Sequence, residues 1–403
     1  MSGKHKSVFR KIVGWLHLWL GLVSGLVVLI VSITGCLFVF EKEISDVTHK
    51  KILFVEKAHS ATVPLSAMKE KAQTVLGTSM PVQYIITHQQ PDRAWEFMAY
   101  KENDSALTYF GATEYFISVF VNPYTGEITG TRNYKTDFFN IIKFVHWSLL
   151  LNTQYGQPIV GWGTFIFVIL LVTGLILWYP KKWNRATRQQ AFKVKWKARF
   201  KRLNYDLHNV FGFYSMLLAL ILGLTGMVFS FQWFSGLVYA VAAGTTKTPQ
   251  QKEIKSKDTA AVAAIPPLDI AFQSARAQLP DAKRIGISPA SGEEGTIYMY
   301  GYKGRETYYN YDQLQFDQYS GQLLHRRNDR EKNKGEKLIE MNYDIHVGAI
   351  GGLTGKIIAF IISFICASLP VTGFLVWWGK RKNRQWAMGN RQGARSKGNK
   401  NHH

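Results

Sequence analysis

Four long apolar runs constrain the fold of this chain more than any other feature. A helix needs about 20 mostly apolar residues to cross the hydrocarbon core of a bilayer. Four runs in the 403-residue sequence are long enough, and ordinary polar sequence separates them. They cover residues 12–40, 158–179, 207–240 and 355–378. The sequence therefore predicts a membrane α-helical protein with substantial parts outside the membrane.

The distribution of basic residues predicts how the chain crosses the membrane. A net charge of +22 is compatible with nucleic-acid binding, but Lys and Arg gather at the ends of the apolar runs. Residues 4–11 and the tail 380–400 are rich in them, and residues 181–202 contain ten Lys or Arg and no acidic residue. Such clusters mark the cytoplasmic side of a span. We therefore expect both termini in the cytoplasm, residues 41–150 and 241–350 exported, and no nucleic acid as a partner.

The two cysteines, Cys36 and Cys366, lie inside apolar runs. We therefore expect neither a disulfide framework nor covalent haem attachment through Cys-x-x-Cys-His. The segment 33–36, Ile-Thr-Gly-Cys, resembles a lipoprotein processing site. Thr-Gly, however, occurs near the end of all four runs, at 34–35, 173–174, 225–226 and 372–373. We interpret it as a packing feature and expect the first helix to be retained.

Repeated spacings indicate that the chain contains two related halves. The spacing from histidine to threonine is 17 residues for His17–Thr34 and His208–Thr225, 27 for His146–Thr173 and 26 for His346–Thr372. A glycine follows the first histidine of each half by four residues, at Gly21 and Gly212. Runs one and three therefore match, and so do runs two and four.

The exported segments also match each other. Each has an amphipathic helix pattern, three alternating strand patterns and a turn that ends in glycine. The predicted elements are 65–76, 82–87, 94–100, 115–121 and the turn 122–126 in the first segment, and 268–279, 284–288, 296–301, 307–316 and the turn 317–321 in the second. The predicted fold is an internally duplicated four-helix transmembrane core with two extracytoplasmic α+β modules.

This fold divides the chain into eight parts. They are 1–40, the cytoplasmic N-terminus and first span; 41–136, the first module; 137–180, an interfacial helix and the second span; 181–206, a basic cytoplasmic loop; 207–240, the third span; 241–340, the second module; 341–379, the fourth span with its entry; and 380–403, a basic cytoplasmic tail.

Helix lengths predict the depth of four histidines in the membrane. His17 and His208 lie about 9 Å of helix beyond a cytoplasmic basic pair. A continuous helix from His146 to Trp178 would be about 48 Å long, which exceeds a hydrocarbon core of about 30 Å. We therefore expect a break at 152–158, with His146 and His346 at the exported face. A pseudo-twofold axis along the membrane normal would pair His17 with His208 and His146 with His346.

Paired histidines in a helix bundle are suited to ligate both axial positions of a haem iron. A single histidine in a span is more often held by a hydrogen bond to a neighbouring helix, but four in repeated positions favour function. Gly21 and Gly212 would make room for the flat macrocycle. Arg10 and Arg202 would hold propionates, although their role as topology signals also explains them. Zinc is the rival metal, but it needs a third or fourth ligand.

Other residues near the histidines receive more ordinary interpretations. We expect Asp206 and Asp344, each two residues before a histidine, to be helix caps. Trp15, Trp19 and Trp147 are expected in interfacial aromatic belts, with contact to haem as an alternative. His49, His59, His88 and His325 are expected to be solvated surface residues.

Several motifs in order resemble the PepSY-associated transmembrane family, which includes bacterial inner-membrane siderophore-iron reductases. The motifs are GWLHLWLGLVSG with ITG, VHWSLLL with GWGTF and LVTGLILWYPKKW, NYDLHNVFGFYS with LTG, and IHVGAIGGLTGKIIAF with TGFLVWW. The resemblance implies two periplasmic PepSY-like modules, a bacterial inner-membrane location, and b haems held by His17, His146, His208 and His346. It also implies reduction of ferric iron delivered as a chelate, without assigning residues that bind that chelate.

These observations predict a haem-dependent ferric-siderophore reductase that carries electrons across the membrane through two b haems. The sequence has no Gly-x-Gly-x-x-Gly loop, so the donor is expected to be a quinol, a cytoplasmic reductant or another protein. The expected partners are membrane lipid and a ferric siderophore or other ferric chelate. Two alternatives stay open: a non-catalytic membrane protein that binds peptides or regulates a partner, and a carrier that handles haem or metal.

Overall fold

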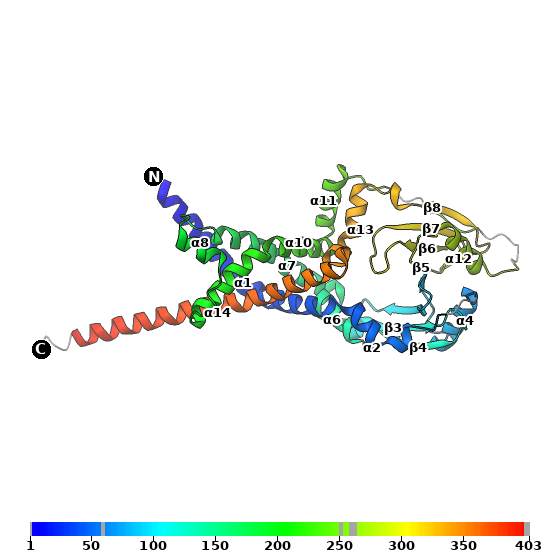
Figure 1. Ribbon diagram of the computed structural model, residues 1–403, viewed down its shortest axis with the longest axis horizontal. Helices are drawn as coiled ribbons and strands as arrows, with labels where there is room; N and C mark the ends of the chain where they lie inside the picture. Colours follow the sequence, from blue (N-terminus) through cyan, green and yellow to red (C-terminus); the bar gives the residue numbers. More distant parts are fainter. Residues whose placement is uncertain (1, 58–60, 250–252, 258–263, 399–403) are drawn as a thin grey trace. The chain divides into compact units, whose positions relative to one another are not determined.

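The computed structural model describes residues 2–57, 61–249, 253–257 and 264–398, with side chains described for 8–381 within these ranges (Figure 1). The chain forms two compact units. Unit 1 contains the segment up to Cys36, Ile159–Met227 and the segment from Ile358 onward. Unit 2 contains Leu37–Pro158 and Val228–Ile357. His59, which we expected at the surface, lies outside the described residues.

Four helices among the described residues are long and apolar enough to cross a membrane, at Val8–Phe38, Thr153–Trp178, Phe200–Ser230 and Ala349–Arg381. They consist of α1 (Ser2–Phe38); α7 (Thr153–Trp178); α9 (Phe200–Asp206), the π-turn η1 (Leu207–Phe211) and α10 (Gly212–Ser230); and η3 (Ala349–Gly351) with α14 (Gly352–Gly398). Large apolar side chains project outward from them, and Val23, Leu26 and Phe364 are 72%, 67% and 65% exposed. Such a surface suits contact with lipid.

Two predicted span boundaries are wrong. The third run was expected to continue to residue 240, but the helix ends at Ser230 because Phe231 adopts an extended conformation. A separate helix, α11 (Gln232–Ala243), follows. The break expected at 152–158 lies at 149–152 instead. Helix α7 continues through Pro158, because a proline near a helix start removes one hydrogen bond without ending the helix.

The described part of unit 2 contains one eight-stranded antiparallel sheet in the order β4-β3-β2-β1-β5-β6-β7-β8. The strands are β1 (Tyr84–His88), β2 (Trp95–Glu102), β3 (Thr113–Val121), β4 (Ile128–Asn133), β5 (Arg284–Ser288), β6 (Thr296–Tyr302), β7 (Tyr311–Asp317) and β8 (Leu323–Arg327). The segments Leu37–Pro158 and Val228–Ile357 contribute four strands each. They join where β1 pairs with β5, with Ile86 opposite Gly286.

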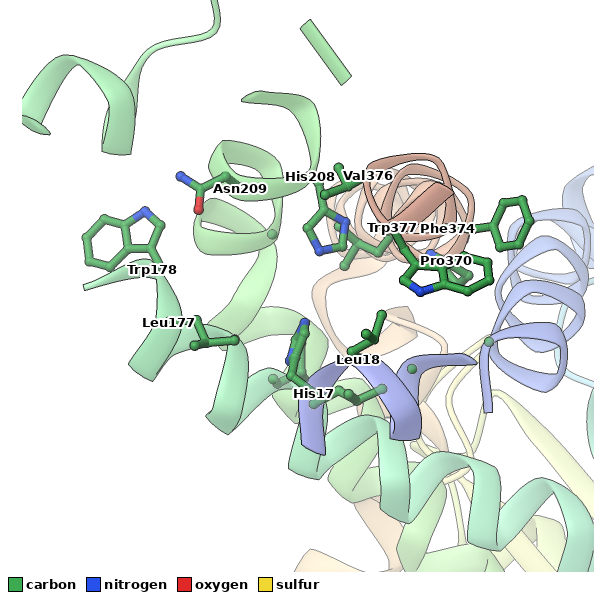
Figure 2. Close-up of a pocket in the computed structure, with 18 of the residues that line it drawn as sticks. His17, Leu18, Leu177, Trp178, His208, Asn209, Pro370, Phe374, Val376 and Trp377 are labelled. Carbon is green, nitrogen blue, oxygen red and sulfur yellow. The ribbon is translucent and has the colours of Figure 1, made fainter. Parts of the chain in front are cut away.

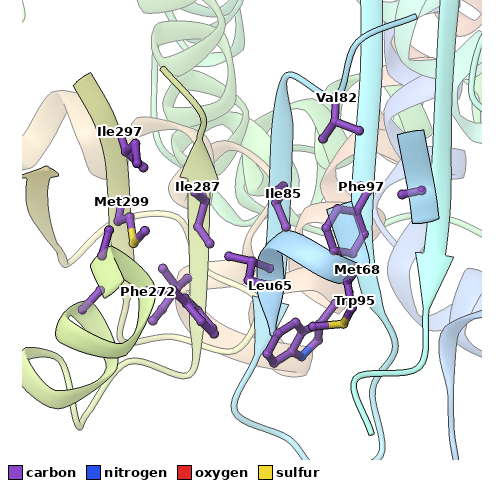
Figure 3. Close-up of a cluster of buried hydrophobic side chains, with 14 of the residues drawn as sticks. Leu65, Met68, Val82, Ile85, Trp95, Phe97, Phe272, Ile287, Ile297 and Met299 are labelled. Atoms are coloured by element: carbon purple, nitrogen blue, oxygen red, sulfur yellow. The ribbon is translucent and has the colours of Figure 1, made fainter. Parts of the chain in front are cut away.

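Two helices cover one face of this sheet (Figure 3). They are α4 (Leu65–Leu76) and α12 (Pro267–Gln278), and the predicted ranges 65–76 and 268–279 agree with them to within one residue. Alternate side chains of the central strands point toward these helices and are fully buried. They include Phe97, Ile85, Ile287 and Met299. Because Ile85 pairs with Ile287 across the join, both chain segments of unit 2 contribute to one core.

Shorter helices complete unit 2. They are α2 (Glu41–Thr48), α3 (Lys50–Leu53), α5 (Tyr109–Ala112), α6 (Phe138–Ser148), α13 (Lys334–His346) and the 3-10 turn η2 (Asp329–Glu331). Helix α8 (Arg185–Phe192) belongs to unit 1. It is held there by a hydrogen bond of 3.1 Å from Trp178 Nε1 to the Ala191 carbonyl.

Candidate functional site

His17 and His208 face each other in unit 1 (Figure 2). His17 lies on α1 and His208 on the π-turn η1, and their ring centroids are 6.4 Å apart with planes at 80°. Two imidazoles on opposite sides of one metal, each with a metal–nitrogen bond of about 2 Å, would place their centroids about 6 Å apart. The spacing therefore fits one metal ion between the two rings. We call these residues the His17–His208 pair.

Threonine hydroxyls orient both rings of this pair. His17 Nδ1 lies 2.9 Å from Thr173 Oγ1, and His208 Nδ1 lies 3.0 Å from Thr372 Oγ1. Each threonine also donates its hydroxyl proton to the carbonyl four residues earlier, at 2.9 Å for Thr173 and 2.8 Å for Thr372. Because that proton is already committed, the hydroxyl oxygen accepts from Nδ1–H of the histidine. This tautomer leaves the lone pair on Nε2, the nitrogen available to a metal.

The glycines that follow these threonines lie against the rings. A Cβ added to Gly174 would approach Cε1 of His17 to 3.3 Å, and one added to Gly373 would approach Cε1 of His208 to 3.2 Å. A side chain at either position would therefore displace the imidazole. We predicted Thr-Gly as a packing feature; in α7 and α14 it also positions the histidines.

A cavity of about 460 Å³ surrounds the His17–His208 pair. Its walls are mostly apolar, and Trp377, Phe374 and Leu18 line it in Figure 2. Gly21 and Gly212, predicted to leave space, both lie in the wall. Their nearest neighbours beyond their own helices are equivalent leucines, Leu170 at 3.8 Å and Leu369 at 3.6 Å from an added Cβ.

The two arginines predicted to face this cavity make other contacts. Arg10 donates to the Leu177 carbonyl at 2.5 Å, and Arg202 Nε lies 2.8 Å from Asp206. Neither lines the cavity, whereas Lys380 does. The guanidinium groups of Arg10 and Arg202 are thus held by a carbonyl and a carboxylate at the helix ends, and their assignment to propionates stays a prediction.

His146 and His346 form a second pair, in unit 2. Their ring centroids lie 5.9 Å apart with planes at 67°. Phe229 packs against His346 at 5.7 Å and against Trp147 at 6.0 Å. We call these two residues the His146–His346 pair, and its spacing also fits one metal between two imidazoles.

Both helices that carry this pair end at the histidine or shortly after it. Helix α6 begins at the Asp137 cap, whose side chain accepts from the amides of Phe139 and Asn140. It ends where Leu149 and Leu150 take positive φ values of 56° and 59°. Left-handed leucine costs about 1–2 kcal/mol. Backbone hydrogen bonds from Tyr109 N to Leu150 O and from Asn152 N to Leu107 O hold the turn.

Helix α13 likewise begins with a side-chain cap and is followed by a residue with positive φ. Asn333 and Glu336 form a capping box at its start, and Gly348 follows His346 with a φ of 75°. A Cβ at Gly348 would come within 2.4 Å of the Gly355 carbonyl oxygen, so the close approach of the two chain segments requires glycine there.

The two aspartates near the histidines do not cap helices with their side chains: Asp206 precedes η1 without a capping hydrogen bond, and Asp344 lies inside α13. Asp206 ends α9, is fully buried and accepts from the backbone N–H of Lys195 at 3.2 Å. Asp344 lies inside α13 and accepts from the backbone amides of Tyr308 and Tyr309 at 2.8 and 2.9 Å. Burial raises the pKa of Asp344. Each aspartate therefore ties a loop to the helix segment that precedes a histidine.

One lysine and three tryptophans lie near the histidine pairs in sequence, and their surroundings differ. Lys143 lies one turn before His146, and burial lowers its pKa. Its ammonium group lies 4.9 Å from the centroid of the Phe144 ring. Trp15 and Trp19 are exposed, as belt residues would be, whereas Trp147 packs on Phe229.

The histidines outside the two pairs differ in their exposure to solvent. His325 is exposed and His49 is partly exposed. His88 is half-buried in β1, and burial together with the nearby Arg93 and Arg284 lowers its pKa to about 3. The expectation of a solvated residue is therefore wrong for His88. A neutral histidine beside two guanidinium groups instead belongs to the packing of the sheet.

The described residues contain no group of three or more His, Cys, Asp or Glu side chains that could hold a metal ion. A tetrahedral zinc site needs such a group. Two opposed imidazoles instead suit a metal whose other positions are filled by a macrocycle.

Four candidate membrane-spanning helices and an antiparallel sheet with its helices define a membrane protein with an α+β part. The sequence matches the family model of the PepSY-associated TM region over residues 14–380, and the chain belongs to this family. A comparison with curated proteins found no match.

Proposed function

We propose that the protein is an inner-membrane di-haem b oxidoreductase that passes electrons to a ferric chelate of the siderophore type. The observation that carries this proposal is the presence of two histidine pairs with centroid spacings of 6.4 and 5.9 Å. Each b haem, when bound, supplies an iron that exchanges one electron. The chain's own contribution is to hold four imidazoles in fixed positions.

The described residues around the His17–His208 pair fit a haem. Thr173 and Thr372 orient the rings and leave Nε2 as the ligating nitrogen. The apolar cavity has glycines in its wall where a flat ring would need space. Lys380 at the cavity and Lys143 beside His146 are further cations that we assign to the propionates.

We further propose that the chain is internally duplicated and that each exported segment is a PepSY-like module. Each segment supplies one helix and a four-stranded meander to the sheet. The central pairing of Ile86 with Gly286 joins the same position of each meander, because both residues are the third of their strands. In this proposal both termini and the 181–206 loop lie in the bacterial cytoplasm, as the basic clusters predict.

The proposed reaction transfers one electron for each iron. A donor is oxidised on the cytoplasmic side, and a ferric ion in the periplasmic chelate is reduced to ferrous iron, which the chelate holds less tightly. Because the sequence has no dinucleotide-binding loop, we assign the donor to a quinol or a cytoplasmic reductant.

The test begins with an absorbance spectrum of the detergent-purified protein, oxidised and then reduced with dithionite, and an iron determination on the same sample. We expect a Soret band that shifts on reduction and two haem irons per chain. Mixing the reduced protein with a ferric chelate should reoxidise it.

Histidine variants assign the pairs. His17→Ala or His208→Ala should remove one haem, and His146→Ala or His346→Ala should remove the other. His325→Ala is the matched control, because His325 is exposed and should leave both haems in place. A native protein without a Soret band would contradict the proposal and favour a peptide-binding or regulatory role. Bound haem that leaves the protein during turnover would favour a carrier.

A further inference from the structure

Two partly exposed tyrosine rings lie on and against α13, the helix that carries His346. Tyr308 and Tyr343 are 45% and 36% exposed, and their ring centroids lie 5.3 Å apart with planes at 89°. Tyr343 precedes His346 by three residues on α13, which places both on the same side of the helix. The rise between them is about 4.5 Å. The exposed ring pair is therefore one helical turn from a proposed haem ligand.

The Tyr308 segment is fixed to α13 by a buried carboxylate. Asp344, next to Tyr343, is fully buried and accepts hydrogen bonds from the backbone amides of Tyr308 and Tyr309. From the other side, Arg284 Nη2 donates to the Thr307 carbonyl at 2.7 Å. The position of the Tyr308 ring is therefore determined by two buried charged groups, one acidic and one basic.

Arg284 also places a positive charge next to the Tyr308 ring. Its guanidinium carbon lies 4.2 Å from the Tyr308 centroid and 4.7 Å from the Tyr302 centroid. Among the described side chains, Arg284 Nε and Asp344 Oδ1 are buried without a hydrogen-bond partner. Buried polar atoms are costly when unpaired. Both atoms belong to the two groups that hold the Tyr308 segment.

Three further tyrosine rings on β6 form a row that begins next to Tyr308. Tyr302 lies 5.9 Å from Tyr308, Tyr300 6.5 Å from Tyr302 and Tyr298 6.3 Å from Tyr300, measured between ring centroids. These three rings on β6 are half-buried. The strongly exposed end of the row is thus the end nearest His346.

We propose that the Tyr308–Tyr343 ring pair is the docking site for the electron acceptor, an inference that rests on the proposed function. Tyrosine provides rigid stacking area with a polar tip, and large exposed aromatic rings are typical of binding surfaces. The Arg284 charge behind Tyr308 favours a ligand with negative charge. The acceptor class that fits is a ferric chelate with planar, conjugated oxygen-donor groups. Docking there brings the iron next to the helix that carries His346.

The main experiment measures how fast reduced protein is reoxidised as chelate concentration increases. The two probes are a ferric catecholate, whose ligands are planar and conjugated, and ferric EDTA, whose ligands are not. In Tyr308→Ala and Tyr343→Ala we expect the half-saturating concentration of the catecholate to rise at least about tenfold, with the rate at saturation little changed. Ferric EDTA should reoxidise the native protein and all of the variants at the same rate. Tyr308→Phe and Tyr343→Phe should behave as the native protein does.

Tyr298→Ala is the matched control, because Tyr298 belongs to the same row but lies at its far end. It should leave the half-saturating concentration unchanged. Binding of a redox-inert gallium catecholate, measured by calorimetry, gives a second result that does not depend on electron transfer. It should weaken in Tyr308→Ala and Tyr343→Ala only.

The possible failures are distinguishable. If the native protein holds no haem, or neither chelate reoxidises it, the proposed function fails. If the native protein reduces the catecholate and both Ala variants saturate at the native concentration, the docking site is wrong. The docking site is also wrong if Tyr298→Ala weakens gallium catecholate binding as much as Tyr308→Ala does. Haem content and the reduced spectrum of each variant establish that it has folded.

Discussion

Thr173 Oγ1 lies 2.9 Å from His17 Nδ1, and the same two atoms in Thr372 and His208 lie 3.0 Å apart. Each threonine stands in a Thr-Gly pair, and a Cβ added to the glycine would lie within 3.3 Å of the same imidazole ring. The Thr-Gly pairs of α7 and α14 therefore fix the tautomer, the orientation and the available space of the two histidines. Groups that hold a metal-ligating histidine commonly determine how well the metal site forms.

Removing either hydroxyl should weaken the proposed haem site. In Thr173→Val or Thr372→Val, Nδ1–H loses its acceptor and the ring loses its fixed orientation. We expect haem affinity to fall by about 10–100-fold, because loss of such a supporting hydrogen bond has that effect at metal sites. Haem titration of the apoprotein followed by the Soret band measures the change. Thr173→Ser and Thr372→Ser keep the hydroxyl and should bind nearly as the native protein does.

Filling the space beside either imidazole should also weaken haem binding, because the added side chain would push the ring out of place. Gly174→Ala places a Cβ 3.3 Å from His17 Cε1, and Gly373→Ala places one 3.2 Å from His208 Cε1. We expect lower haem occupancy at the His17–His208 pair and native occupancy at the His146–His346 pair. Gly236→Ala is the control, since nothing lies within 4 Å of its added Cβ. Equal haem content in all three variants would contradict the assigned role.

The stability of unit 2 should fall in mild acid because of His88. The folded protein lowers the pKa of this histidine from 6.5 to about 3, mainly through burial. Below pH 6.5 the unfolded chain therefore binds a proton that the folded chain does not, so stability falls as the pH decreases toward 3. In His88→Gln the melting temperature should depend less on pH between 7 and 5. His325→Gln, at an exposed position, should follow the native curve.

The join between β1 and β5 should be sensitive to any side chain at position 286. An added Cβ at Gly286 would come within 2.0 Å of the Tyr84 hydroxyl oxygen and 3.3 Å of Tyr302 Cε2. Overpacking of this kind costs about 1–3 kcal/mol. Gly286→Ala should therefore lower the melting temperature, and Tyr84→Phe in the same chain should restore part of it. If Gly286→Ala melts as the native protein does, the close packing of Tyr84 on β5 is wrong.

Periodicity predicted the parts of the fold that bury a continuous apolar face. The four spans and the helix at 65–76 follow from such patterns, because burial of one face requires them. The strands β4 and β8 were not predicted. They are the edges of the sheet, their side chains are mostly exposed, and ITGTRN and LLHRR show no regular alternation.

The histidine pairings were predictable because repeated spacings identified equivalent positions along the chain. The contacts of Thr173 and Thr372 were not, because sequence spacing does not show which neighbouring helix faces a ring. The π-turn at His208 also has no counterpart at His17, where α1 is regular, so the repeat could not predict it. Arg10 and Arg202 were proposed from their place in the basic pairs before His17 and His208, and that pattern could not show that Leu177 and Asp206 are their partners.

The pairing of β1 with β5 has a consequence for biogenesis. Strand β5 begins about 200 residues after β1 ends, and two candidate membrane spans lie between them in the chain. The meander β1–β4 is therefore synthesised before β5 exists, and the edge of β1 stays unpaired until the segment that contains β5 follows. An open strand edge invites pairing with other chains. The eight-stranded sheet can thus close only after both intervening candidate spans have been synthesised.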